Sequence, residues 1–157
     1  MAGLFPFFCV PVGWQSGLIG SPWELDAAGP DAFDCWGLVE HVWAEQAGLD
    51  LSPFRAGEVS GELRARHKQV AVWTADAVDA QRFIALAQPR PLAIGIVRHK
   101  RFPVHVGLYA EGGLFVHACQ DSGQVRQDRV SNYRTAKGSR LTGWYWPAAT
   151  TLRVKAA

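Results

Sequence analysis

The sequence carries little net charge of either sign. Sixteen lysines and arginines stand against fourteen aspartates and glutamates, so the formal net charge is only +2. A nucleic-acid-binding protein usually presents a concentrated basic face, whereas the two short basic clusters here, at 64–68 and 98–101, are typical of solvated surface. We therefore expect no nucleic acid as a partner and keep an acidic polymer only as a minor alternative substrate.

Cysteine is also scarce, with one residue each at positions 9, 35 and 119. An odd count does not suggest a disulfide framework, and a Cys9–Cys119 bridge is an alternative that nothing in the sequence supports. The close ligand pairs typical of zinc sites are missing, which disfavours a zinc site built from Cys35, His105 and His117. We therefore expect no metal site.

A targeting segment and a long hydrophobic run are lacking as well. The first 14 residues are apolar, but they have no positive region and two prolines interrupt them. They make a poor signal peptide and are too short to cross a bilayer. We interpret residues 1–17 as an apolar N-terminal arm, 18–147 as one compact domain and 148–157 as a C-terminal tail, because 157 residues without internal repeats fit a single domain.

The clearest helix is expected at 35–47. Its apolar residues recur at helical spacing: Leu38, Val39, Val42 and Trp43. Glu40 and Glu45 are expected on the polar side of this helix, and Gly48 is a natural stop after its last turn.

The segments on either side of this helix have weaker patterns. Residues 11–34 are rich in glycine, proline and aspartate and predict a loop. Further helices are expected within 58–70 and from Thr74 or Asp76 into the low eighties. The short apolar run at 82–91 does not distinguish a helix from a strand.

The second half of the chain favours strands. Four segments are rich in β-branched and aromatic residues: 92–97, 104–110, 114–119 and 141–146. Residues 123–130 are a candidate for another strand, and the "EGG" sequence at 111–113 predicts a hairpin turn. Helices followed by an antiparallel sheet indicate an α+β domain, with the first helix packed on the sheet.

Cys35 stands at the start of the predicted helix 35–47. The thiolate form of cysteine is the nucleophile, and a helix N-terminus lowers the pKa of a thiol because its unpaired N–H groups favour negative charge. Such a nucleophile also needs a nearby base, usually a histidine that a third group holds in one orientation. The sequence offers five histidines: 41, 67, 99, 105 and 117.

Two of these histidines lie in the predicted hairpin. His105 and His117 are twelve residues apart across the "EGG" turn, and such positions can become neighbours in paired antiparallel strands. Alternation places His105, Gly107 and Tyr109 on one face of their strand. Because Gly107 has no side chain, we expect it to leave room beside His105 for a substrate.

Each of these residues has a plainer interpretation. A lone cysteine in an apolar helix is more often a packed core residue, and a lone strand histidine is more often a structural group. We interpret His41 as structural, since it lies off the face of Cys35, and His67 and His99 as solvent-facing. Cys119 has no expected role.

The motifs "FDCWGLV", "HVGLY" and "HA" together resemble the NlpC family of cell-wall cysteine peptidases, a compact papain-like group. They correspond to Asp34 and Cys35 at a helix start, to His105–Tyr109 on a strand and to His117 one hairpin later. The resemblance extends over about 18–147. It implies a papain-like NlpC-type fold, with helices packed on an antiparallel sheet.

The resemblance also implies roles for individual residues. Cys35 would be the nucleophile, His105 the general base and later the acid, and His117 the group that orients the imidazole of His105. The backbone N–H of Cys35 would help to form the oxyanion hole. The oxyanion and substrate groove would involve Trp23, Asp34, Trp36 and Gly107. No cofactor is implied.

Three features depart from the common pattern of the family. Trp23 stands where many members carry a tyrosine whose hydroxyl is thought to assist at the oxyanion, and Trp36 replaces a common serine. The interval of 70 residues between Cys35 and His105 is long and implies an inserted segment around 55–90.

The upstream sequence "GSPWELDAAGPDAFDCWGLV" is most similar to the phage-borne branch of the family, whose domains belong to tail-tip or tail-assembly proteins. The resemblance implies a peptidoglycan endopeptidase that cuts near the γ-D-glutamyl–diamino acid bond and aids cell-wall penetration during genome entry. Its place would be the virion tail tip, after synthesis in the host cytoplasm without a signal peptide, with other tail-tip proteins as partners. The alternatives are a structural tail-tip protein with a silent or blocked site, and an amidase or acyl-transfer enzyme.

Overall fold

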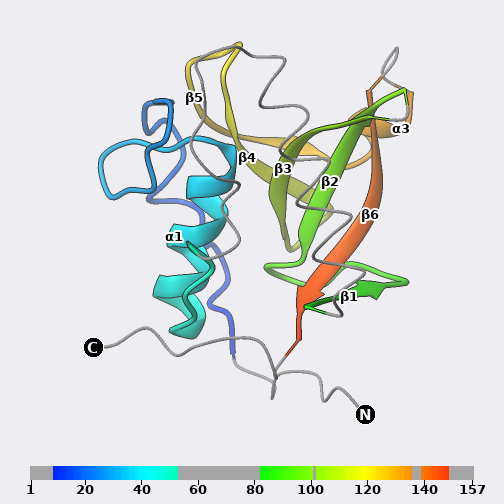
Figure 1. Cartoon of the computed structure of the whole chain (residues 1–157), viewed down its shortest axis with the longest axis horizontal. Helices are drawn as coiled ribbons and strands as arrows, with labels where there is room; N and C mark the ends of the chain where they lie inside the picture. Colours follow the sequence, from blue (N-terminus) through cyan, green and yellow to red (C-terminus); the bar gives the residue numbers. More distant parts are fainter. Residues whose placement is uncertain (1–8, 53–81, 101, 136–138, 149–157) are drawn as a thin grey trace.

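The computed structural model describes residues 9–52, 82–100, 102–135 and 139–148. Its elements are α1 (Cys35–Ala47), β1 (Phe83–Leu86), β2 (Ile94–His99), β3 (Phe102–Ala110), β4 (Leu114–Cys119), β5 (Gln124–Arg129), α3 (Asn132–Thr135) and β6 (Ser139–Pro147). The strands form one antiparallel sheet in the order β1-β6-β2-β3-β4-β5. Helix α1 packs against β3 and β4 (Figure 1). This arrangement confirms the α+β class and the packing of the first helix on the sheet.

Helix α1 begins and ends at the predicted residues. Asp34 is its N-cap, and the Oδ1 atom of Asp34 accepts a hydrogen bond of 2.6 Å from the backbone N–H of Gly37. Gly48 follows the last turn with a φ of 65° and donates its N–H to the carbonyl of Ala44. An N-cap aspartate and a left-handed glycine satisfy backbone groups that the helix ends leave unpaired, so local sequence sets both limits.

One side of α1 that was expected to be polar is covered. Glu45 is exposed as predicted, but Glu40 is only 8% exposed, so its predicted place on the polar side is wrong. Glu40 lies one turn after Gly37, and a Cβ atom at Gly37 would collide with the backbone of Ala27. The loop that enters the helix, residues 26–33, therefore lies against this side of α1 as well.

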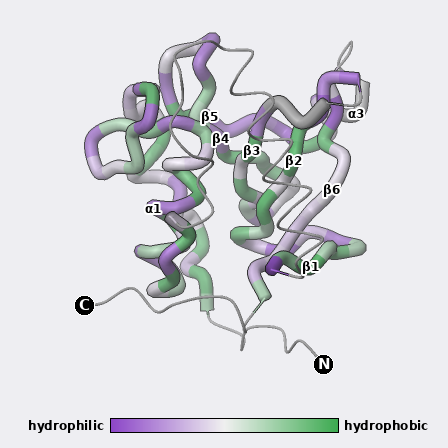
Figure 2. The backbone as a smooth tube through the Cα atoms, viewed as in Figure 1, coloured by the Kyte–Doolittle hydropathy of each residue, from purple (hydrophilic) through white to green (hydrophobic). Residues whose placement is uncertain are grey.

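The core lies between α1 and the central strands. The helix contributes Leu38, Val39, Val42 and Trp43, all buried as expected. The ring of Trp43 meets that of Trp146 edge to face at 4.8 Å, and the guanidinium of Arg90 lies 3.6 Å from the ring centre of Trp146. Figure 2 shows hydrophobic residues on the central strands and hydrophilic ones along β5, at the edge of the sheet.

The predicted strands are confirmed, with small changes of length. Strands β2, β3, β4 and β6 match the four expected segments, β5 is the further candidate, and a turn at 111–113 joins β3 to β4. The ambiguous run at 82–91 contains β1, an edge strand that pairs with β6. The helices expected at 58–70 and from Thr74 or Asp76 lie outside the described residues.

The described part of the N-terminal arm packs on the domain. Val10 and Trp14 lie against the core, as does Leu18 just after the arm, and residues 12–20 form a series of turns. Cys9 is exposed and is not joined to Cys119. Among the helices that the structure describes, none is long and apolar enough to cross a membrane.

We predict that Gly37→Ala destabilises the protein because the added methyl group would collide with the backbone of Ala27. The expected loss in the free energy of unfolding is about 3 kcal/mol, measured by urea denaturation. Gly17 is the matched control, since a Cβ atom there meets nothing within 4 Å, and Gly17→Ala should change the free energy by less than about 0.5 kcal/mol. Equal stabilities of the two variants would contradict the close contact of loop and helix.

Candidate active site

Cys35 is the first residue of α1, as the sequence predicts. Its side chain is partly exposed and packs against the core. Helix α1 packs on β3 and β4. These are the strands that carry His105 and His117. Cys35 is thus at the N-terminal end of a helix that packs on the two histidine-bearing strands, and its approach to His105 stays a prediction.

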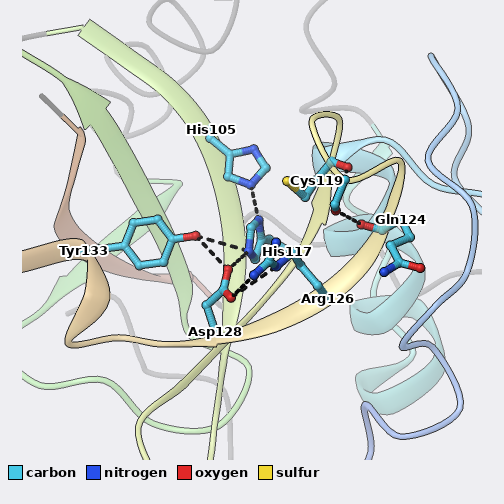
Figure 3. A network of polar contacts seen from close by, with 8 residues as sticks. His105, His117, Cys119, Gln124, Arg126, Asp128 and Tyr133 are labelled. Atoms are coloured by element: carbon cyan, nitrogen blue, oxygen red, sulfur yellow. Dashed lines mark hydrogen bonds and ion pairs between the residues drawn. The ribbon is translucent and has the colours of Figure 1, made fainter. Parts of the chain in front are cut away.

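The two histidines of the hairpin are in direct contact. Leu108 pairs with Val116 in the register of β3 and β4, so His105 and His117 stand diagonally across the two strands. The Nε2 atom of His105 lies 2.7 Å from the Nδ1 atom of His117, which is a hydrogen bond (Figure 3). The prediction that these positions become neighbours is confirmed.

The hydrogen-bonded chain continues onto β5. The Nε2 atom of His117 lies 2.7 Å from the Oδ2 atom of Asp128. The opposite carboxylate oxygen, Oδ1, accepts two hydrogen bonds from Arg126, of 2.7 and 3.1 Å. The hydroxyl of Tyr133, on α3, donates to Oδ2 of Asp128 at 3.2 Å and lies 3.2 Å from Nε2 of His117 (Figure 3). His117 thus has a bonded partner on each ring nitrogen.

Aromatic packing holds the rings of this chain in place. The ring of Phe115 stacks on that of His117 at 5.0 Å and meets His105 edge to face at 6.3 Å. A Cβ atom at Gly107 would lie 2.6 Å from the Phe115 ring and 2.7 Å from the carbonyl oxygen of Val116. The ring of Phe115 therefore occupies the space beside Gly107. The expectation that Gly107 leaves room beside His105 for a substrate is wrong.

Burial sets the protonation states of the two histidines. Desolvation and, to a smaller extent, the neighbouring His117 lower the pKa of His105 to about 3, although the charge of Asp128 opposes part of this shift. Desolvation also lowers the pKa of His117, and the hydrogen bond to Asp128 opposes it only in part. Both imidazoles are accordingly neutral at pH 7.

The groups around Asp128 favour its ionised form. Burial raises the pKa of Asp128, but the hydrogen bonds and charges of His117 and Arg126 outweigh burial, so the pKa is lowered overall. Burial and the charge of Asp128 raise the pKa of Tyr133. At neutral pH this hydrogen-bonded series therefore consists of two neutral imidazoles, the carboxylate of Asp128 and the neutral phenol of Tyr133.

Three residues expected in an oxyanion and substrate groove have visible structural contacts. Asp34 is 3% exposed, and its second carboxylate oxygen accepts a hydrogen bond of 2.9 Å from the backbone N–H of Asp26. Trp36 is 8% exposed and belongs to the core. The backbone N–H of Trp23 donates to the carbonyl of Gly123, which ties the entry loop to the turn before β5. Their contact with a substrate stays a prediction.

The remaining histidines lie apart from the chain of hydrogen bonds. His41 packs on the ring of Phe33 at 5.1 Å, in keeping with a structural role. His99 is exposed and lies 3.3 Å from the hydroxyl of Ser139, while His67 falls outside the described residues. In the part of the chain that the structure describes, no group of three or more acidic, histidine or cysteine side chains could hold a metal ion.

Sequence reasoning missed Asp128, Arg126 and Tyr133. A signal was present, since Arg126 and Asp128 alternate along the candidate strand 123–130 and share one face. The register that pairs His117 with Arg126 then brings Asp128 within diagonal reach of the histidine. Tyr133 had no comparable signal, because it follows β5 on a separate short helix.

We predict that the stability of the protein falls with pH below about 6.5 and that His105 contributes to this fall. The unfolded chain binds a proton on His105 near pH 6.5, whereas the folded protein does so only near pH 3. The free energy of unfolding therefore decreases as the pH falls through this window, by up to about 1.4 kcal/mol per pH unit for one proton.

Urea denaturation between about pH 6.5 and 4 measures this slope. His105→Asn, which removes the titrating ring, should give a shallower dependence than the wild type. His99→Asn at the exposed histidine is the matched control and should retain the wild-type slope. Identical slopes for the wild type and His105→Asn would show that the ring is not held neutral by the fold.

Comparisons with known proteins identify the family and the fold. The sequence model of the NlpC/P60 family matches residues 20–142. Among solved structures, NlpC2 from Trichomonas vaginalis has a TM-score of 0.55 at 17% identity, and the match covers 82% of this chain and 42% of that one. NlpC1 from the same organism has a TM-score of 0.54 at 18% identity, with 83% and 42% covered.

A third structure is the NlpC/p60 domain of the peptidoglycan hydrolase SagA, with a TM-score of 0.50 at 20% identity. That match covers 82% of this chain and 92% of the SagA domain. This chain spans less than half the length of the two Trichomonas chains, and no curated protein matches its sequence. The structural likenesses show the fold, and the family match covers most of the sequence: the chain belongs to the NlpC/P60 family, a family of cysteine peptidases that act on peptidoglycan, and has its papain-like fold.

Proposed function

We propose that this protein is a cysteine peptidase that hydrolyses the peptide stem of peptidoglycan, with Cys35 as nucleophile, His105 as general base and His117 as the residue that orients His105. The observation that carries the proposal is the 2.7 Å hydrogen bond between His105 and His117. This hydrogen bond joins β3 to β4, the two strands on which the helix of Cys35 packs. The chain that contains it belongs to the NlpC/P60 family.

The first half of the reaction forms a thioester. The sulfur of Cys35 attacks the carbonyl carbon of the scissile amide, and the thiol proton passes to the unprotonated nitrogen of His105. The negative charge that develops on the carbonyl oxygen is stabilised by the backbone N–H of Cys35, at the N-terminal end of α1 where the helix dipole favours negative charge. The C–N bond then breaks, and His105 returns the proton to the leaving amine.

The second half restores the enzyme. A water molecule attacks the thioester carbon and gives one proton to His105. When the C–S bond breaks, the product leaves as a carboxylic acid and the Cys35 sulfur recovers a proton from His105. Because His105 is neutral at rest, it is a base in each attack and an acid in each departure.

The substrate proposed in detail is the bond between γ-D-glutamate and the diamino acid of the stem peptide. Support comes from the family to which the chain belongs and from the structural likeness to SagA, itself a peptidoglycan hydrolase. Of the groove residues expected from the sequence, Trp23, Asp34 and Trp36 are proposed to contact this substrate, whereas Gly107 is not, because Phe115 fills the space beside it.

The proposed setting is the tail tip of a phage virion, where the enzyme would open the cell wall during genome entry after synthesis in the host cytoplasm. The support is the similarity of the sequence before and around Cys35 to the phage-borne branch of the family. Other tail-tip proteins are the proposed partners. Mass spectrometry of purified virions would detect the chain in this location, and its absence from virions would refute the setting without touching the enzymatic proposal.

We predict that the purified protein releases new stem-peptide fragments from muropeptides and that Cys35→Ala abolishes this release, because the variant has no nucleophile. Mass spectrometry of the digests measures the products. Cys9→Ser is the matched control: Cys9 is exposed and lies on the N-terminal arm, so its variant should cut at the wild-type rate.

Two outcomes would reject the proposal. One is the absence of stem-peptide products with the folded wild-type protein, and the other is an equal yield from Cys35→Ala. Hydrolysis of small acyl substrates in place of muropeptides would favour the amidase or acyl-transfer alternative. A phage with Cys35→Ala that assembles normally but injects poorly would support an enzymatic role, whereas failed assembly would favour a structural tail-tip protein.

A further inference from the structure

The hydrogen-bonded chain from His105 does not stop at the orienting residue His117. It continues to Asp128, which Arg126 and Tyr133 hold from two sides (Figure 3). Each ring nitrogen of a neutral histidine is either a donor or an acceptor, never both. A chain of this kind can therefore transmit the position of a proton from one end to the other.

The direction of the chain follows from its carboxylate end. An ionised carboxylate only accepts hydrogen bonds, so the 2.7 Å contact between Oδ2 of Asp128 and Nε2 of His117 requires a hydrogen on that nitrogen. His117 is neutral and 3% exposed. Its Nδ1 atom accordingly carries a lone pair and is the acceptor in the next link.

The same reasoning applies to His105. Its Nε2 atom lies 2.7 Å from the bare Nδ1 atom of His117, so the hydrogen of this contact belongs to His105. Because His105 is also neutral, its Nδ1 atom is unprotonated. That nitrogen, which takes no part in the chain, is the one able to accept the thiol proton of Cys35.

We propose that Asp128 is a positioning residue that, through His117, fixes the tautomer of His105 so that Nδ1 of His105 is the available base. This inference rests on the proposed function, since it supplies the base which that reaction needs. Asp128 touches neither the substrate nor the reacting atoms. It acts through two imidazoles that stand in line on neighbouring strands.

The fold divides the two oxygens of Asp128 between separate tasks. Arg126 donates two hydrogen bonds to Oδ1, while His117 and Tyr133 both hydrogen-bond to Oδ2. Arg126 lies two residues before Asp128 on the same face of β5, and Tyr133 comes from α3. The carboxylate is therefore held in one orientation by elements other than the strand that carries His117.

The chain also stabilises charge during the reaction. When Nδ1 of His105 accepts a proton, the ring becomes cationic in a partly buried place, which is costly without a counter-charge. The negative charge of Asp128 favours the protonated form of His105. Asp128 is thus a counter-charge placed one imidazole away from the base.

The direct test is ¹⁵N NMR of the full chain labelled at histidine, because the two ring nitrogens report which one carries the proton. In the wild type at neutral pH, both His105 and His117 should carry it on Nε2. In Asp128→Asn an amide N–H₂ group can face His117, so His117 and then His105 should shift toward the Nδ1–H tautomer. Asp121→Asn, at an exposed aspartate in the turn before β5, is the matched control and should keep the wild-type signals.

Two results would overturn the proposal: a proton on Nδ1 of His105 in the wild type, or unchanged tautomers in Asp128→Asn. The first does not depend on any variant, so the proposal stays testable if Asp128→Asn fails to fold. Tyr133→Phe, which removes a single hydrogen bond to Asp128, should give a smaller shift in the same direction.

A kinetic readout separates positioning from a general loss of structure. On muropeptides, Asp128→Asn should lower kcat by on the order of a hundredfold or more with little change in KM, because a misplaced proton disables the base and leaves the groove intact. A raised KM with an unchanged kcat would overturn the role. If the wild type proves inactive on peptidoglycan, the proposed function fails, but the NMR signals still decide whether Asp128 sets the tautomers.

Discussion

A buried imidazole with a partner on each nitrogen is the constraint on which the site depends. His117 is 3% exposed, accepts from His105 on one side and donates to Asp128 on the other. A buried polar group without such partners would be costly. The strands β3, β4 and β5 must therefore keep the register that brings these three side chains together. The same sheet that holds the side chains thus also determines, in our proposal, which ring nitrogens carry a proton.

The surroundings of His117 serve the same constraint. Phe115 stacks on its ring, and the absence of side chains at Gly107 and Gly95 makes room for Phe115. The backbone of β3 is thus shaped to seat an aromatic ring, which in turn restricts how the imidazole can turn. Packing and hydrogen bonding therefore favour the same orientation of the His117 ring, and together they make this part of the site rigid.

Helix α1 positions the proposed nucleophile by a separate mechanism. Asp34 caps the helix and also accepts from the backbone of Asp26, so one buried carboxylate fixes both the start of the helix and the loop that enters it. The close approach of Ala27 to Gly37 brings this loop against the helix. Cys35 therefore stands at a helix end whose position is set from two directions.

The sequence by itself determined the helix 35–47 with its two ends, the strands of the second half and the meeting of His105 with His117, because capping, alternation and hairpin turns act over a few residues. Only the tertiary structure decided that Asp128 and Tyr133 complete the chain, that Phe115 fills the space at Gly107 and that Glu40 is covered. These outcomes depend on the register of β4 with β5 and on the packing of a loop against a helix. The strand register and the loop packing are both contacts between separate segments, and the local sequence pattern of one segment does not predict its contact with the other.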